Sequence, residues 1–394
     1  MSSNVWMFSR RLPPNPVANA LSCRLDELRC AGEVWVDLTE SNPTRAGFAY
    51  PPDLLRAMAD PRALSYEPHP FGMAAARAAV AADCLRRGVT VDPAQVVLTA
   101  SSSEAYAWLF KLLCDPDDRV LVPRPSYPLF EHLTRLEAVH AEPYELEYHG
   151  RWTIDFDSLA RAAAAGARAI LVVSPNNPTG SYVTRGELTR LSDICHRSGL
   201  ALIVDEVFAD YPLDAPGDRV TDVALATEVL AFTLGGLSKT AGLPQLKLGW
   251  IVVGGPAARR DEALRSLELI ADSYLSVSTP VQVAAGELLA RGGAVREQIH
   301  ARVRLNLEAL RRAAAAFRAC EVLTCEGGWY AVVRVPAHRT EDELVLELLE
   351  RERILVHPGY FFDFPREAYV VVSMLLPPEA FADATGRMLR LASD

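Results

Sequence analysis

The sequence predicts an α/β protein, with a large domain built on a mostly parallel sheet flanked by helices and a smaller α+β domain. From about residue 93, short runs of Val, Ile and Leu alternate with amphipathic helical segments. Such runs are typical of strands buried on both faces, as in parallel sheets covered by helices. After about residue 290 this alternation changes to shorter units. We therefore place the large domain at 45–290 and build the small domain from 1–44 and 291–394.

Six apolar runs in the large domain are predicted strands. They are Gln95–Thr99, Arg119–Pro123, Ala167–Ser174, Leu200–Phe208, Ala231–Leu237 and Leu248–Gly255. Segments with helical spacing of apolar residues, such as SEAYAWLFKLL, PLFEHLTRLEA and ELTRLSDICHRSG, separate several of them. Ligands of open α/β sheets bind beyond the carboxyl ends of the strands, so residues that directly follow each run are the candidates for function.

The small domain is predicted to begin with a long amphipathic helix over 293–317. Ile299, Val303, Leu307 and Leu310 fall on one face of this helix. Beyond it, WYAVVRV, ILVHPG and YVVVSM read as strands, whereas EDELVLELLERE and the last residues read as helices. The sequence contains no repeat and no low-complexity linker.

The composition argues against several classes of protein. A formal net charge of −10 leaves no basic face for nucleic acid. The seven cysteines are odd in number, scattered and never spaced C-x-x-C, which indicates reduced thiols rather than disulfides or a zinc site. No apolar run is long enough for a signal peptide or a membrane span. We expect a soluble cytoplasmic protein with no metal site and no nucleic-acid or membrane partner.

Small hydroxyl residues and an aromatic residue follow two of the predicted strands. Ser101, Ser102 and Ser103 stand where a helix begins, and their hydroxyls and backbone N–H groups suit a phosphate. Plain N-capping is the alternative function of these serines. Tyr127, in PRPSYPLF, could stack on a flat cofactor, although a tyrosine at such a position is more often part of the core.

An amide and a carboxylate follow two further strands. SPNNPTG, from Ser174 to Gly180, is a rigid turn that can hold Asn177 in a fixed place, and a plain turn would not require its paired Asn. Asp205 ends an apolar strand, where an unpaired carboxylate is costly. It needs a cationic or hydrogen-bonding partner, which is either a protonated pyridinium nitrogen or a structural Arg.

Lysine is rare in this chain, which has only Lys111, Lys239 and Lys247 among its 40 basic residues. Lys239 lies in the glycine-rich stretch GGLSKTAGLPQLKLGW. Unlike Arg, Lys can be desolvated to a neutral amine that attacks a carbonyl to form a Schiff base. A surface lysine is the alternative. Together with the serines, Tyr127, Asn177 and Asp205, however, this lysine predicts a site for pyridoxal 5′-phosphate, a flat phosphorylated aldehyde with a ring nitrogen.

On these motifs, the chain resembles the class I/II aminotransferases of fold type I, the aspartate-aminotransferase-like enzymes that depend on pyridoxal phosphate (PLP). The likeness covers nearly the whole chain, and SPNNPTG and GLSKTAGLPQLKLGW are its most specific parts. It implies a seven-stranded-type sheet and identifies Lys239 as the Schiff-base lysine and proton shuttle. By the same likeness, Asp205 pairs with the pyridinium nitrogen, and Asn177 hydrogen-bonds the phenolic oxygen of the cofactor.

The resemblance implies further contacts with the cofactor. Tyr127 stacks on the ring, and Ser101, Ser102 and Ser103 hold the phosphate. Lys247 stands where the family usually has an Arg that clamps the phosphate. Tyr66, in SYEPHPFGM, is similar to a tyrosine that reaches a phosphate across a subunit interface. A homodimer with shared active sites is therefore implied.

The sequence departs from the family pattern at several positions. Phe208 replaces a usual Tyr, and Gly236 replaces a common Ser. Val371 stands where the family has the Arg that grips the α-carboxylate of the substrate, and a valine supplies no such pair. Either Arg334 or Arg45 takes over this role, or the substrate lacks a conventional α-carboxylate. Exposure to solvent is the ordinary alternative for either Arg.

Three functions remain in view. The first is an aminotransferase that moves an amino group between an amino acid or amine and a keto acid or aldehyde. The second is a β-eliminating C–S lyase with the same cofactor. The third is a non-catalytic PLP-binding regulator, which is disfavoured because the segment before Asp37 is too short and proline-rich for a DNA-binding domain.

Overall fold

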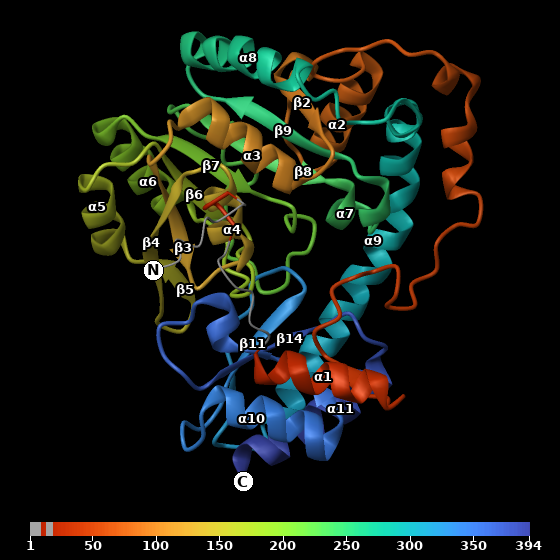
Figure 1. Ribbon diagram of the computed structural model, residues 1–394, viewed down its shortest axis with the longest axis vertical. Coiled ribbons are helices and arrows are strands. Elements are labelled where there is room, and N and C mark those ends of the chain that lie inside the picture. The colour runs from red at the N-terminus through yellow and green to blue at the C-terminus, as the bar shows by residue number, and fades with distance from the viewer. Residues whose placement is uncertain (1–8, 13–18) are drawn as a thin grey trace, which may run out of the picture.

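An eight-stranded mixed sheet forms the centre of the large domain in a computed structural model, which describes residues 9–12 and 19–394 (Figure 1). In spatial order the strands are β2 (Val96–Thr99), β9 (Gly249–Gly254), β8 (Ala231–Gly236), β7 (Ala201–Asp205), β6 (Ala169–Val173), β3 (Arg119–Arg124), β4 (His140–Tyr148) and β5 (Trp152–Ile154). All six predicted runs are strands of this sheet.

The sheet is mostly parallel, which confirms the predicted α/β class. Strands β8, β7, β6, β3 and β4 pair in parallel along the middle, whereas β9 and β5 run antiparallel to their neighbours. The seven strands implied by the family become eight, because β5 adds a short antiparallel edge to β4.

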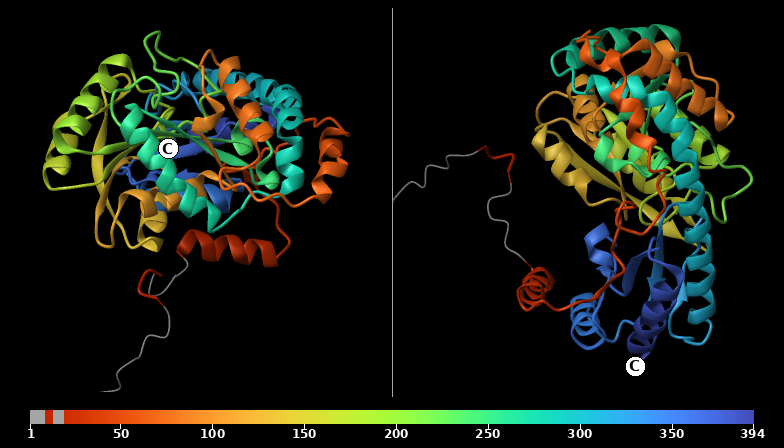
Figure 2. Two further views of the ribbon diagram at one scale, coloured as in Figure 1. Left: turned by 90° about the horizontal axis from the view of Figure 1, so that it is seen from above. Right: turned by 90° about the vertical axis from the view of Figure 1, so that its right-hand side faces the viewer.

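Helices cover both faces of the sheet (Figures 1 and 2). Alternate residues of β6 point to opposite faces, so Ala169 and Leu171 belong to one apolar core and Ile170 and Val172 to another. The first core is completed by α3 (Ser102–Leu113), α4 (Leu129–Leu136) and α8 (Ala257–Asp272). The second is completed by α5 (Phe156–Ala164) and α6 (Arg185–Ser198), and α2 (Ala74–Arg86) covers β2 and β9 on the same side.

The C-terminal part forms the smaller α+β unit. Its sheet has the order β10 (Glu321–Val322), β11 (Tyr330–Arg334), β14 (Tyr369–Ser373) and β13 (His357–Pro358). Its helices are α10 (Glu341–Glu347), which continues as a turn of π-helix over Leu348–Glu352, and α11 (Pro378–Ser393). The elements predicted from the C-terminal sequence are all present.

The N-terminal segment joins this unit through β1 (Val36–Asp37), which pairs in parallel with β12 (Ile354–Leu355), and α1 (Ala20–Cys30) packs beside it. The single helix α9 (Thr279–Ala314) runs from the large sheet to the C-terminal unit (Figure 2). It begins before the helix predicted at 293 and passes through the predicted domain boundary at 290. The division into domains stays a prediction.

Candidate active site

The predicted site residues gather at the carboxyl end of the large sheet. Asp205 is the last residue of β7, the Asn177 turn follows β6, and Tyr127 follows β3. Lys239 lies in α7 (Leu237–Thr240), the helical turn directly after β8. Because β6, β7 and β8 are parallel neighbours, their carboxyl ends meet at one edge. This is where open α/β sheets bind ligands.

Asp205 is buried and held by two hydrogen bonds. The Tyr106 hydroxyl donates to its Oδ2 at 2.8 Å, and the Val207 backbone N–H donates to its Oδ1 at 3.0 Å. Burial raises the pKa of Asp205, and the hydrogen bonds and the positive charge of Lys239 oppose that shift. A buried carboxylate that accepts one hydrogen bond on each oxygen still has lone pairs for a further cationic hydrogen bond.

The Lys239 amine lies against an aromatic wall. Its Nζ is 4.5 Å from the centre of the Trp329 ring and 5.2 Å from that of Phe208. The Tyr211 hydroxyl donates to the Lys239 carbonyl and fixes the backbone there. Burial lowers the pKa of Lys239 to about 8, and Asp205 partly offsets this by raising it. A lysine with such a pKa is a candidate nucleophile and proton carrier near neutral pH.

The two Asn residues of SPNNPTG have different functions. Asn176 is fully used within the protein, since its amide donates to the Pro125 carbonyl and to Thr179, and its Oδ1 accepts from Ser126. The Oδ1 of Asn177 is buried and has no hydrogen-bond partner among the described residues. A buried amide without a partner requires an explanation, and a bound ligand supplies one.

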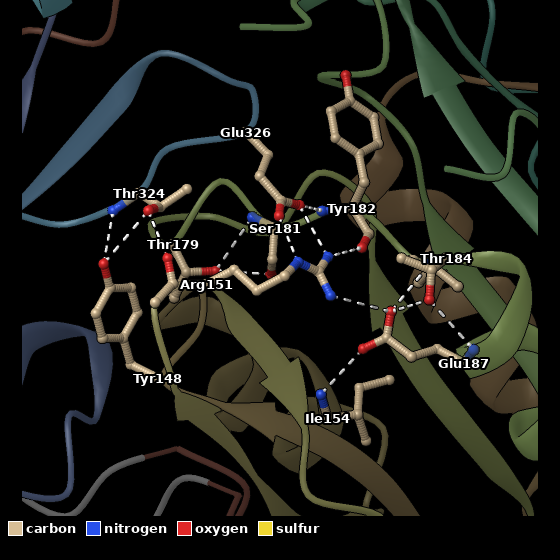
Figure 3. Close-up of polar contacts among 12 residues, drawn as sticks. Tyr148, Arg151, Ile154, Thr179, Ser181, Tyr182, Thr184, Glu187, Thr324 and Glu326 are labelled. Atoms are coloured by element: carbon tan, nitrogen blue, oxygen red, sulfur yellow. Dashed lines mark hydrogen bonds and ion pairs between the residues drawn. The ribbon is translucent and has the colours of Figure 1, made fainter. Parts of the chain in front are cut away.

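The turn that carries Asn177 is held by a polar network between the two parts of the molecule (Figure 3). The Arg151 guanidinium donates to both carboxylate oxygens of Glu326, at 2.7 and 3.1 Å, and to the Tyr182 carbonyl at 3.2 Å. The Tyr182 N–H donates to Glu326 Oε2 at 2.8 Å. Thr184 and Glu187 cap α6 just beyond. The network fixes the chain on the C-terminal side of the turn.

The three predicted serines lie where a phosphate would fit. Ser101 is the N-cap of α3 and accepts from the Glu104 N–H at 3.2 Å, whereas Ser102 and Ser103 begin the helix. Their hydroxyls have no side-chain partner within the described residues, and the first N–H groups of a helix are free to bind an anion.

Lys247 lies at the same end of the sheet. Thr99 of β2 pairs with Gly249 of the antiparallel strand β9. Ser101 comes two residues after Thr99 and Lys247 two residues before Gly249, so both lie just beyond the end of this pair of strands. A Cβ on Gly249 would come within 3.0 Å of the Ser101 carbonyl carbon, so glycine keeps this cradle open. Lys247 is exposed and makes no ion pair with any described residue. Its charge is therefore available for a phosphate.

The two predicted tyrosines lie in different places. Tyr127 is 39% exposed and contacts Phe130 edge-on, with 6.1 Å between ring centres. Burial, followed by the charge of Asp205, raises its pKa, which places the phenol within electrostatic reach of that carboxylate. Tyr66 is 74% exposed on the outer surface and has no ring or hydrogen-bond partner in the described chain.

Arg334, one of the two predicted carboxylate contacts, lies on the surface of the small sheet. Arg334 shares its strand face with Tyr330 but lies four residues further along β11, or roughly 13 Å at strand spacing. It is exposed at the outer end of the strand, where it pairs with Glu321. Strand parity specifies the face but not the distance, and Tyr330 alone reaches the aromatic wall, through Phe208.

Arg45 and Val371 differ in whether they leave a cation for the substrate carboxylate. Arg45 is exposed and forms no ion pair within the described chain, so it stays a candidate. Val371 is fully buried in β14 between Val332 and His357. No residue of β14 is basic, so this strand supplies no carboxylate clamp.

Two residues of the site were not predicted from the sequence. Tyr106, the donor to Asp205, lies in a helix whose apolar pattern is that of an ordinary core helix. Trp329 forms the wall beside Lys239 and is fully buried. The only feature of the sequence that could have indicated Tyr106 is its position, one helical turn after the three serines.

These residues fit pyridoxal phosphate. Asn177, whose buried Oδ1 lacks a partner in the described chain, the Gly249 cradle beside Ser101 and the Lys239–Asp205 pair supply one partner for each polar part of that cofactor. In the described chain, no group of three or more His, Cys, Asp and Glu side chains is placed to hold a metal ion. Nor does any described helix have the length and apolar character needed to cross a membrane.

The sequence confirms this class of enzyme. Residues 33–382 match the aminotransferase class I and II family, so the chain belongs to that family of PLP-dependent enzymes and is an aminotransferase. It is 26% identical over 385 residues to the glutamate-pyruvate aminotransferase AlaA of Haemophilus influenzae, covering 94% of this chain and 93% of the relative. It is also 28% identical over 356 residues to an alanine aminotransferase of Mycobacterium bovis, covering 86% and 81%.

Solved structures have the same fold. An aminotransferase from Escherichia coli superposes with a TM-score of 0.86 at 24% identity and 98% coverage of both chains. An aspartate aminotransferase from Thermus thermophilus with maleate gives a TM-score of 0.82 at 24% identity, covering 98% of this chain and 99% of that one. These likenesses confirm fold type I, and the comparisons lend no support to the lyase alternative.

Proposed function

We propose that this aminotransferase moves an amino group between an amino acid and a 2-oxo acid, with Lys239 as the amine that attaches the cofactor. The observation that carries this proposal is the position of Lys239. It directly follows a central strand, is partly buried against two aromatic rings and lies within electrostatic reach of Asp205. Neither Lys111, which pairs with Glu137, nor the exposed Lys247 has such surroundings.

Each residue of the site has a proposed part in binding or proton transfer. Pyridoxal phosphate supplies an aldehyde and a protonated ring that withdraws electrons from the substrate carbon. Asp205, oriented by Tyr106, holds the ring nitrogen in its protonated form. Asn177 would bind the phenolic oxygen through its side-chain amide, whose Oδ1 has no hydrogen-bond partner in the described chain. Lys239 carries the proton to and from the reacting carbon, because its pKa of about 8 makes both protonation states accessible near neutral pH.

The remaining cofactor contacts are also proposals. Ser101, Ser102 and Ser103 would bind the phosphate through their hydroxyls and the start of α3. Lys247 would add one positive charge at the same place, without the fork of an Arg. Tyr127 would cover the face of the ring from the outer side.

The donor is proposed to be an amino acid by analogy with the alanine and glutamate-pyruvate aminotransferases. Its carboxylate cannot be gripped by β14, which has no basic residue. Arg45 is exposed and follows the segment whose Leu38 and Glu40 carbonyls accept hydrogen bonds from Ser373 at the end of β14. We therefore propose Arg45 and Asn177 as the carboxylate contacts.

We also propose a cytoplasmic homodimer. Leu64 is 91% exposed and Tyr66 74%, so two large apolar side chains stand together on the surface of one short segment. Such a patch is typical of a subunit interface. In a dimer, Tyr66 would reach the phosphate of the partner site. If sedimentation finds a fully cofactor-loaded and active monomer, this part of the proposal fails.

A half-reaction screen tests the proposed reaction. Cofactor-loaded protein is mixed with single amino acids, and the cofactor absorbance and the release of oxo acid are followed. Loss of absorbance with one amino acid, reversed by a 2-oxo acid, supports amino transfer and identifies the donor. Response only to amines without a carboxylate would replace the proposed substrate class. Release of pyruvate and ammonia without loss of absorbance would contradict the proposal.

A further inference from the structure

A second cavity lies on the other side of β7 from the cofactor site. Asp205 and Glu206 are consecutive, so their side chains leave the chain in opposite directions. Asp205 faces Tyr106, whereas Glu206 faces Arg87 and a cavity of about 340 Å³. None of the residues proposed to hold the cofactor lines this cavity. Its volume is within the range of small-molecule sites.

Three arginines line the cavity, and they are not equally neutralised. Arg86 is fully engaged, with Asp83 at 2.9 Å and Asp210 at 2.7 Å. Arg219 makes no ion pair and no side-chain hydrogen bond within the described residues. Its guanidinium carbon lies 5.8 Å from the centre of the Tyr182 ring, which also lines the cavity. The cavity therefore contains a positive charge without a protein partner.

Two further polar atoms at this cavity are buried and unpaired. Glu206 Oε1 accepts from the Val223 N–H at 2.9 Å, but Glu206 Oε2 has no hydrogen bond among the described residues. Its side chain is only 3% exposed. Arg87 Nη1 approaches Oε2 only to 3.5 Å, and Arg87 Nε has no partner either. Buried atoms of this kind normally bind water or a ligand.

Glu206 can act as a donor in this setting. Burial, and next the charge of Asp222, raise its pKa to about 8, and Arg87 opposes the shift. The other charged or titratable groups that line the cavity are Arg86, Tyr182, Asp210, Arg219 and His300. Near neutral pH, Glu206 thus holds a proton that its Oε2 can donate to an acceptor.

We propose that this cavity binds a small monocarboxylate. The carboxylate would accept from Arg219, from the free Nε of Arg87 and from Glu206, and its negative charge would offset that of Arg219, which makes no ion pair in the described chain. The organic part would occupy the rest of the cavity, against the Tyr182 ring. The site differs from the cofactor site and does not depend on which amino donor the enzyme uses.

Calorimetric titration of the cofactor-loaded protein with benzoate tests this proposal. Benzamide, which has the same shape without the charge, is the matched ligand. Arg219→Gln removes the unpaired cation, and Arg259→Gln is the matched control, because Arg259 lies on the surface of α8 in an exposed pair with Glu262. We expect saturable benzoate binding, no benzamide binding and a loss of affinity of about tenfold or more in Arg219→Gln alone.

A second variant tests the donor function of Glu206. Gln in place of Glu206 keeps a donor at the same place at any pH. Benzoate affinity of the native protein should fall as pH rises above about 8, when Glu206 ionises, and should stay constant in Glu206→Gln.

Several outcomes would overturn the proposal. They are equal binding of benzamide and benzoate, unchanged affinity in Arg219→Gln, and binding of inorganic phosphate but not of benzoate. A change of cofactor absorbance that saturates together with the binding heat would place benzoate in the active site instead.

Discussion

The surroundings of Lys239 predict that attachment of the cofactor depends on pH around 8. Only the neutral amine attacks a carbonyl. Burial lowers the pKa of Lys239 from 10.5 to about 8. Because the shift is downward, the proton is lost as pH rises through about 8, and the rate of attachment should rise over that range and then level off.

The size of the effect follows from these two pKa values. At pH 7 an amine with a pKa of about 8 is about 9% neutral, whereas one with a pKa of 10.5 is about 0.03% neutral. Burial therefore raises the reactive fraction by roughly 300-fold. The charge of Asp205 raises the pKa of Lys239, so Asp205→Asn should move the midpoint to a lower pH.

Rapid mixing of the apoprotein with saturating pyridoxal phosphate, from about pH 6 to about 10, measures this midpoint through the cofactor absorbance. Lys111→Arg is the control, because Lys111 lies in a separate ion pair with Glu137, and its profile should match that of the native protein. A rate that keeps rising to about pH 10, or a midpoint that moves upward in Asp205→Asn, would refute the reasoning.

Three further predictions concern stability, measured by denaturant titration. Arg151→Ala leaves a buried glutamate without its partner and should lower the free energy of unfolding by about 3 kcal/mol, whereas Arg168→Ala, in a more exposed pair, should cost less than about 1 kcal/mol. Burial raises the pKa of Glu206 from 4.5 to about 8, so between these two pH values the folded state holds a proton that the unfolded chain has released. The free energy of unfolding should therefore fall as pH rises from 4.5 to about 8, and it should fall less in Glu206→Gln. Gly180→Ala, at φ +76° with a backbone oxygen 2.7 Å from the new Cβ, should cost about 1–3 kcal/mol, and Gly217→Ala, in open space, close to none.

The sequence predicts the central strands well because burial on both faces leaves a clear record in Val, Ile and Leu. It does not reveal β4 or β5 in the same way. β4 reads HAEPYELEY, and most of its residues are exposed or half-buried near the edge of the sheet, so no apolar run marks it. The early start of α9 was missed although the segment before residue 293 has apolar residues at helical spacing, such as Val281, Leu288 and Leu289. Several positions of that buried face are Ala or Gly, which mark a helix face less clearly than Val, Ile or Leu.

Part of the candidate site could also be predicted. Lys239, Asp205 and Asn177 stand out because their chemistry is unusual at the end of a buried strand. Tyr106 and Trp329 could not be found in this way, since an aromatic residue in an apolar segment looks like core until its partner in space is known.

The most direct test of the central claim is to locate the cofactor on the chain. The cofactor-loaded protein is reduced with borohydride and digested, and the lysine that carries the added mass is identified. The chain offers only Lys111, Lys239 and Lys247. The account predicts that the mass is found on the peptide containing Lys239 and is lost in Lys239→Ala. Stoichiometric modification of Lys111 or Lys247, or unchanged trapping in Lys239→Ala, would contradict it.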